Sequence, residues 1–161
     1  MPDKPLQEQD FEPALSLGPL TLAYLDEMVE IENLSFASPW SKEAYRKELT
    51  ENDLAIYVGI FYGSHLIGYA GMWKVLDEGH ISNIAIHPNF RGRHFGELLL
   101  EYLKQQAILN RIERMTLEVR RSNISAQRLY KRFGFTFAGV RPHYYNDNNE
   151  DAFIYWLEIE K

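Results

Sequence analysis

The sequence predicts a single mixed α/β domain with a central β-sheet of about six or seven strands flanked by about four helices. Short apolar or alternating runs, which are typical of strands, recur along the chain. Segments with apolar residues at helical spacing lie between them. No internal repeat, linker or low-complexity tract divides the 161 residues, which are enough for one hydrophobic core.

Composition excludes several classes of protein and of site. The absence of cysteine excludes a disulfide framework, thiolate metal sites and cysteine nucleophiles, and the five histidines lack metal-ligand spacing, so we expect no metal. The net charge of −6 argues against nucleic-acid and membrane partners. Without a long apolar run or a signal pattern, the chain is expected to be soluble and cytoplasmic. We also expect a monomer or a weak dimer.

The first half of the chain is predicted to contain an extension, a strand, two helices and a hairpin. Residues 1–14 are polar and proline-rich, so they are expected to form a flexible extension to a domain over 15–161. Thr21 and Ser41 are candidate helix N-caps. The hairpin strands are apolar on both faces, so the sheet should be covered on both sides. The predicted elements are a strand at 15–20, helices at 22–35 and 42–49, and hairpin strands at 54–62 and 66–75.

The second half is predicted to begin at a turn formed by Asp77-Glu78-Gly79. His87-Pro88-Asn89 ends the next strand, because proline cannot donate to a β-ladder. Gly134 fits the C-cap of a short helix. The predicted elements are a strand at 81–86, a helix at 95–110, a strand at 114–119, a helix at 125–133, and strands at 135–140 and 152–159.

A glycine-bearing basic turn, Arg91-Gly92-Arg93-His94-Phe95-Gly96, joins the strand at 81–86 to the following helix. Free backbone N–H groups and the helix dipole favour a phosphate at such a position. Glycine permits close approach of the backbone, and arginine adds charge. The turn matches neither a nucleotide P-loop nor a dinucleotide fingerprint. Taken alone, it is equally compatible with an ordinary surface loop.

A second motif follows the strand at 114–119. It consists of Leu117-Glu118-Val119-Arg120 and then Asn123, Ala126, Leu129, Tyr130, Gly134 and Phe135 at fixed spacing. Together with the basic turn, it resembles the GNAT superfamily of acetyl-CoA-dependent N-acetyltransferases over nearly the whole chain. Within that superfamily, the chain is most similar to the bacterial ribosomal-protein-alanine N-acetyltransferases (RimI type). The markers of this subgroup are Phe36 with Pro39-Trp40-Ser41, Ser122-Asn123, Tyr144-Tyr145 and Glu150-Asp151-Ala152.

The resemblance implies a GNAT-like domain that transfers the acetyl group of acetyl-CoA to the N-terminal α-amine of a protein, by direct attack in a ternary complex. The implied partner is a protein or peptide N-terminus, with ribosomal proteins among the candidates. Two alternatives stay open. One is a GNAT enzyme that acetylates lysine side chains or small amines, and the other is a non-catalytic acetyl-CoA-binding module.

The resemblance also implies two catalytic residues. Glu118 is the candidate general base, acting through water; the alternative is a carboxylate paired with Arg120 or Arg121. Tyr130 is the candidate general acid for the leaving thiolate; the alternative is a core aromatic residue. The presence of both residues speaks against the non-catalytic alternative.

The implied cofactor residues lie mainly on the strand at 81–86 and in the basic turn. Backbone groups of the strand should pair with the pantetheine arm, and the turn should hold the pyrophosphate. Histidine at the fourth position of the turn departs from the family pattern, which has glycine there. The candidate cofactor residues are Ile84, Ala85, Ile86, Arg91, Gly92, Arg93, His94, Phe95, Gly96, Glu97 and Asn123, the last of which is alternatively a helix cap. The candidate substrate residues are Phe36, Trp40, Tyr144 and Tyr145, which are alternatively lids on the core.

Overall fold

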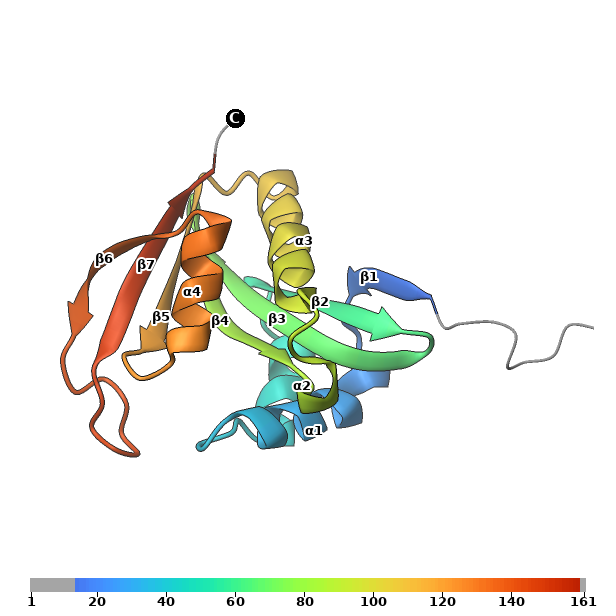
Figure 1. The fold of residues 1–161 in the computed structure, drawn as a ribbon. Coiled ribbons are helices and arrows are strands. Elements are labelled where there is room, and N and C mark those ends of the chain that lie inside the picture. Colours follow the sequence, from blue (N-terminus) through green and yellow to red (C-terminus); the bar gives the residue numbers. More distant parts are fainter. Residues whose placement is uncertain (1–13, 160–161) are drawn as a thin grey trace, which may run out of the picture.

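The computed structural model describes residues 14–159, which form one seven-stranded sheet, four α-helices and two short 3₁₀ helices (Figure 1). The predicted extension over residues 1–14 therefore lies, except for Ala14, outside the described residues. The strands are β1 Leu15–Pro19, β2 Ala55–Tyr62, β3 His65–Val75, β4 Glu78–Ile86, β5 Arg114–Arg120, β6 Thr136–Arg141 and β7 Ala152–Glu158. The helices are α1 Leu25–Ser35, α2 Lys42–Thr50, α3 Phe95–Leu109 and α4 Ile124–Phe133, with 3₁₀ turns at Leu22–Tyr24 and Pro88–Phe90.

The sheet has the order β1-β2-β3-β4-β5-β7-β6, and every neighbouring pair is antiparallel except β4 and β5. These two strands pair in parallel only near their beginnings, from Glu78–Arg114 to His80–Thr116. Beyond His80, β4 continues beside β3, and β5 continues beside β7. The two halves of the sheet therefore diverge, which leaves the second half of β4 without a partner on the β5 side (Figure 1).

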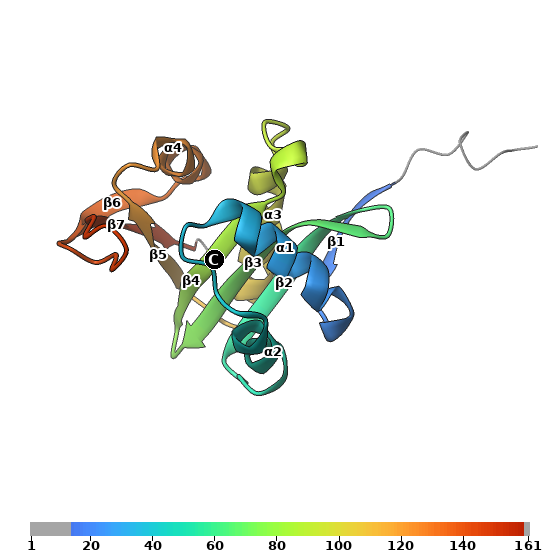
Figure 2. The same cartoon turned by 90° about the horizontal axis from the view of Figure 1, so that it is seen from below.

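The sheet separates two hydrophobic cores, as the apolar faces of the hairpin strands predicted. Helices α3 and α4 cover one face, and α1 and α2 cover the other (Figures 1 and 2). Leu99 and Leu103 of α3 are fully buried in the first core. Met28 and Ile31 of α1 are buried in the second. A site at the divergence of β4 and β5 can thus receive side chains from both layers.

The element boundaries agree with the sequence except at two starts. Ser41 caps α2 by accepting a hydrogen bond from Ala44 N at 3.1 Å, and Gly134 ends α4 with a φ of +118°. Thr21, however, makes no capping hydrogen bond, and a 3₁₀ turn precedes α1. Strand β4 begins at Glu78, because Glu78 pairs with Val75 across a two-residue turn that is shorter than predicted.

Candidate active site

The β3–β4 register shifts at the point where the sheet opens. Ile81 pairs with Met72 and Asn83 pairs with Gly71, so Ser82 is the extra residue of a β-bulge. After the bulge, Asn83 faces the layer of α1 and α2, whereas Ile84 packs against the α3 core. The bulge thus turns β4 just before the three residues predicted to pair with the pantetheine arm.

Backbone groups on the open side of those three residues are not all equivalent. Neither Ile84, Ala85 nor Ile86 pairs with β5. The carbonyl oxygen of Ile86 accepts a hydrogen bond from Arg91 Nε at 2.9 Å. Arg91 also donates to Ser35 Oγ at 3.0 Å, so its guanidinium joins the turn to the ends of β4 and α1. The phosphate-directed charge predicted for Arg91 is therefore already used within the protein, and its place in a cofactor site stays a prediction.

The turn before α3 has the backbone shape expected of an anion site. Gly92 has a φ of +78°, and a β-carbon built on it would meet no atom within 4 Å. His94 is the N-cap of α3, and its side chain makes no capping hydrogen bond. The first N–H groups of α3 have no carbonyl four residues earlier to bind, so they stay available as donors. This arrangement fits a pyrophosphate.

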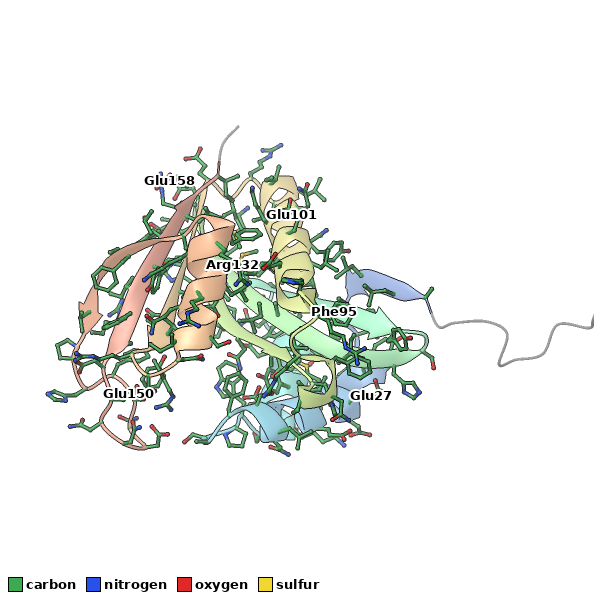
Figure 3. All side chains as sticks on the ribbon, viewed as in Figure 1. Glu27, Phe95, Glu101, Arg132, Glu150 and Glu158 are labelled. Carbon is green, nitrogen blue, oxygen red and sulfur yellow. The ribbon has the colours of Figure 1, made fainter. Side chains whose placement is uncertain are left out.

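The backbone at position 94 and the packing at position 96 both favour glycine in this turn. His94 has a φ of +63°, a left-handed conformation that glycine adopts without strain. Its imidazole is 79% exposed and lies 3.5 Å from Glu97. Glu97 also binds Arg132 of α4 at 2.7 Å. Arg132 is labelled in Figure 3, where its helix lies beside α3. A β-carbon at Gly96 would lie 3.1 Å from Leu129 Cδ2, so glycine there permits the close packing of α3 on α4.

Replacing His94 by valine tests the left-handed backbone. A β-branched residue at positive φ is strained, so the free energy of unfolding should fall by about 1 kcal/mol and the Tm by about 2–4 °C. His94→Gly is the matched control, because glycine accepts the conformation and should leave the Tm within about 2 °C of the wild type. Thermal unfolding followed by circular dichroism measures both. Equal Tm values for His94→Val and the wild type would contradict a left-handed residue 94.

Glu118 lies on β5 with its side chain on the face opposite the α3 core, because Leu117 and Val119 on either side of it are buried in that core. Its side chain is 26% exposed, and its carboxylate lies 3.2 Å from the Arg141 guanidinium of β6. The nearby Tyr144 phenol has its pKa raised, first by burial and then by the charge of Glu118. Glu118 therefore has a charged partner, but it is not the partner that the sequence suggested.

The two arginines considered as partners of Glu118 bind other carboxylates. Arg120 pairs with Asp147 and Glu150, and Arg121 lies 3.9 Å from Asp151. Arg141 was not identified from the sequence, because only the strand order β5-β7-β6 brings β6 near β5. Arg141 would have been found only from the pairing register of β5, β7 and β6.

Tyr130 occupies the buried face of α4 and packs against Phe135 and Tyr155, with ring centroids 5.8 and 6.4 Å away. Burial raises the pKa of its phenol, which therefore stays protonated at neutral pH. Within residues 14–159, its hydroxyl makes no hydrogen bond. Tyr130 is thus a core aromatic residue whose hydroxyl is still available as a donor, so both interpretations made from the sequence are compatible with its position.

Asn123 is the N-cap of α4, as the structural alternative predicted. Its Oδ1 accepts a hydrogen bond from Ala126 N at 3.1 Å. Buried Gln127 holds the same turn by donating to the carbonyls of Arg120 and Arg121 at 3.1 and 2.9 Å. Capping uses the side-chain oxygen of Asn123 and leaves its amide nitrogen for a cofactor contact, which stays a prediction.

Arg120 organises the loop between β6 and β7. Its guanidinium binds both carboxylate oxygens of Asp147 at 2.9 and 3.0 Å and lies 3.3 Å from Glu150. It also stacks 3.9 Å from the centre of the Tyr145 ring. Tyr144 packs edge-on against Tyr145 at 5.1 Å. The two candidate substrate tyrosines are thus fixed to the end of β5 by one arginine.

Glu150 completes this attachment and should make it pH-dependent. Its carboxylate accepts a hydrogen bond from Ser122 N at 2.6 Å, and hydrogen bonding with Ser122 is the main reason its pKa falls from 4.5 to about 2. A lowered pKa stabilises the folded state above pH 4.5, and this contribution is lost as the pH falls toward 2. Glu150→Gln should therefore lower the urea midpoint at pH 7, and the two midpoints should converge in acid. A gap that is equal at all pH values would contradict the ionised hydrogen bond.

The α1–α2 loop supplies the other two candidate substrate residues. Phe36 is 37% exposed, and Trp40 packs against Tyr45 with ring centroids 5.2 Å apart. Figures 1 and 2 place this loop and the β6–β7 loop on the α1–α2 side of the sheet, one on each half of the diverging strands. The four aromatic residues thus come from two loops that face the same side of the molecule.

Two surface hollows of the described chain are lined by none of the predicted cofactor residues. One, of about 450 Å³, lies beside α2 and includes Trp40 in its lining, and another, of about 330 Å³, lies between α1 and the 3₁₀ turn at Pro88–Phe90. Neither hollow is lined by Glu118 or Tyr130.

Within the described chain, no three His, Asp or Glu side chains group as metal ligands. No helix between residues 14 and 159 is long and apolar enough to cross a membrane.

The sequence of this chain is similar to those of known acetyltransferases. Residues 25–135 match the acetyltransferase (GNAT) family. The chain is 44% identical over 142 residues to a Bacillus subtilis protein named "Putative [ribosomal protein bS18]-alanine N-acetyltransferase", covering 88% of this chain and 94% of that protein. It is 34% identical over 131 residues to the Escherichia coli [ribosomal protein bS18]-alanine N-acetyltransferase, covering 80% and 87%.

Solved structures show the same architecture. The crystal structure of the Escherichia coli ribosomal-protein-S18-alanine N-acetyltransferase superposes with a TM-score of 0.83 at 30% identity, over 92% of this chain and 96% of that one. Arabidopsis thaliana NAA60 in complex with acetyl-CoA has the same fold at 16% identity, with a TM-score of 0.82 over 91% and 100% of the chains. The predicted single GNAT-like domain, with a mixed sheet of about six or seven strands and about four helices, is thus confirmed, and the chain belongs to the GNAT family of acetyltransferases.

Proposed function

We propose that this enzyme transfers the acetyl group of acetyl-CoA to the N-terminal α-amine of a protein, with the alanine N-terminus of ribosomal protein bS18 as the first candidate acceptor. The observation that carries the proposal is the identity of 34% to the Escherichia coli enzyme, over most of both chains. Lysine and small-amine acceptors remain the alternatives for the test below. A ribosomal acceptor would place the reaction in the cytoplasm.

The chain offers suitable groups for acetyl-CoA. The unpaired side of β4 at Ile84–Ile86 supplies backbone groups for a pantetheine arm. The turn from Gly92 to the first residues of α3 supplies N–H donors for a pyrophosphate. The amide nitrogen of Asn123 supplies a further donor. Acetyl-CoA, when bound, would supply the thioester that the amine attacks, and a β4 backbone amide would donate to its carbonyl oxygen.

Glu118 and Tyr130 then have complementary roles. The Glu118 carboxylate removes a proton from the attacking amine through water. An α-amine with a pKa of about 7.7–8.0 loses its proton more easily than a lysine amine near 10.4, so a carboxylate suits the α-amine better. The Tyr130 hydroxyl donates toward the leaving sulfur. Since the two side chains lie on opposite faces of the sheet, each can approach a reaction centre at the β4–β5 opening from a different side.

The two aromatic loops are the proposed walls of the acceptor groove. Phe36 and Trp40 form one wall, and Tyr144 and Tyr145 form the other. An extended peptide N-terminus between them would bring its amine toward Glu118, which contributes to the raised pKa of Tyr144 and is therefore close to it.

The test uses two peptides of matched sequence and mass-spectrometric detection. One has a free N-terminal alanine and no lysine, and the other has a blocked N-terminus and one lysine. Acetylation of the first peptide alone is expected. Acetylation of the second alone would move the function to lysine, and acetylation of neither would leave small amines or a non-catalytic role.

A further inference from the structure

The last turn of α1 buries a carboxylate that the proposed mechanism does not use. Glu32 is 1% exposed. It forms no salt bridge within residues 14–159. A buried carboxylate without a cation is costly unless hydrogen-bond donors surround it. The donors around Glu32 therefore indicate what the burial achieves.

Four donors from four different elements converge on Glu32. Oε1 accepts from the backbone N–H of Trp40 at 3.0 Å, and Oε2 accepts from the Tyr45 hydroxyl at 2.7 Å. The Tyr69 hydroxyl also donates to Oε2. The Asn83 amide nitrogen lies 3.5 and 3.4 Å from the two oxygens and also donates to Tyr45. One side chain thus joins the α1–α2 loop, α2, β3 and β4.

The tyrosines act as permanent donors. Burial raises the pKa of the Tyr45 and Tyr69 phenols far above the usual range, and both hydroxyls stay protonated. Hydrogen bonds from neutral donors to a buried carboxylate are stronger than bonds between neutral groups. The Glu32 cluster, defined as Glu32, Trp40 N–H, Tyr45, Tyr69 and Asn83, is therefore a rigid junction.

This junction connects the two parts that the proposed reaction must align. Trp40 belongs to the proposed acceptor groove, and Asn83 directly precedes Ile84 in the bulged part of β4. We infer that Glu32 is a positioning residue that holds the α1–α2 loop against β4, so that the acceptor amine is directed at the β4–β5 opening. The inference rests on the proposed function, and it deepens that function by naming what aligns the groove.

A second buried carboxylate provides a matched control. Glu48 of α2 is 9% exposed and accepts hydrogen bonds from Trp73 Nε1 at 2.8 Å, Asn52 at 2.5 Å and Tyr57 at 3.3 Å. It binds neither the backbone of the α1–α2 loop nor β4 in the described chain. Replacing Glu48 by leucine also removes a buried carboxylate, but it leaves the hydrogen bond of Trp40 N–H to Glu32 intact.

Three variants separate positioning from general stability. Glu32→Leu removes both carboxylate oxygens and leaves Trp40 N–H without its acceptor. The Tyr45 and Tyr69 hydroxyls and Asn83 can still bind one another, since the two hydroxyl oxygens lie 3.3 Å apart. Glu32→Gln keeps a carbonyl oxygen for Trp40 N–H, and its amide can donate to the tyrosine hydroxyls. Glu48→Leu is the control. Glutamine should therefore rescue the property that leucine loses.

The first readout is hydrogen exchange of the Trp40 amide, which does not depend on activity. Exchange should rise about tenfold or more in Glu32→Leu, and it should stay near wild type in Glu32→Gln and Glu48→Leu. The second readout is kinetic. In Glu32→Leu the kcat/KM for the alanine peptide should fall about tenfold or more, while the Kd for CoA stays within about twofold.

The outcomes are distinguishable. Unchanged Trp40 exchange in Glu32→Leu would overturn the inference, even if activity fell. Equal losses of peptide kcat/KM in Glu32→Leu and Glu48→Leu would also overturn it, because they would indicate a general structural role. If the wild-type chain acetylates no peptide, the proposed function is contradicted, and so is the role of Glu32 in directing the acceptor amine. The exchange measurement would still decide whether Glu32 holds Trp40.

Discussion

Glu118→Gln is expected to lower the kcat/KM for an alanine peptide by about 10²–10⁴-fold near pH 6.5, within the range for positioned proton transfer. At this pH most of the α-amine is protonated and needs a base, because its pKa is about 7.7–8.0. Above about pH 9 the free amine predominates, and the defect should shrink. Glutamine has the shape of glutamate, so the Kd for CoA should stay near wild type.

The ion pair with Arg141 makes a second variant necessary. Glu118 could matter only because it binds Arg141 Nε at 3.2 Å. Arg141→Gln removes that partner and leaves the carboxylate in place. If Glu118 is the base, Arg141→Gln should retain most activity, and its pH profile should keep its acidic limb. Equal losses in both variants, or a Glu118→Gln defect of the same size at every pH, would assign Glu118 a structural role.

Tyr130→Phe is expected to reduce kcat by about 10²-fold, because it removes a hydroxyl that donates to the leaving sulfur. Phenylalanine keeps the ring contacts with Phe135 and Tyr155, so folding should be preserved. The pKa of a phenol already lies above that of a thiol, near 8.5, and burial raises the pKa of Tyr130 further. This difference favours hydrogen bonding to the developing thiolate over complete proton transfer, so the thiolate takes its proton from solvent. The expected loss therefore lies at the lower end of the general range.

Tyr155→Phe is the matched control for this prediction. Tyr155 is a buried tyrosine beside Tyr130, and its hydroxyl binds Gln127 at 3.4 Å. Both variants remove one buried hydroxyl from neighbouring rings. Only Tyr130→Phe should slow the single-turnover rate, and both should bind CoA normally. An unchanged rate in Tyr130→Phe would remove Tyr130 from the mechanism.

The strands and helices were predictable because their signals are local. Alternation and helical spacing within each segment located all seven strands and the four α-helices to within about three residues. Start positions failed where tertiary pairing decided them, as at Glu78, which the two-residue turn adds to β4. The Thr21 cap failed because a 3₁₀ turn precedes α1.

The connections among the site residues were not predictable in the same way. The pairing of Glu118 with Arg141 depends on the order β5-β7-β6, which no local pattern encodes. The role of Glu32 depends on contacts with Tyr69 and Asn83, 37 and 51 residues away in sequence. The sequence shows only that a glutamate occupies an apolar position of α1. Without the contacts to the sheet, this glutamate is indistinguishable from an ordinary surface residue.

The binding of two bisubstrate conjugates tests the central claim most directly. In one, CoA is joined through an acetyl group to the α-amine of an alanine peptide, and in the other to a lysine side chain of a matched peptide. Calorimetry should show the α-amine conjugate binding at least about tenfold more tightly than CoA and than the lysine conjugate, because both halves occupy linked sites. Tighter binding of the lysine conjugate, or no gain over CoA for either, would contradict an α-amine acetyltransferase.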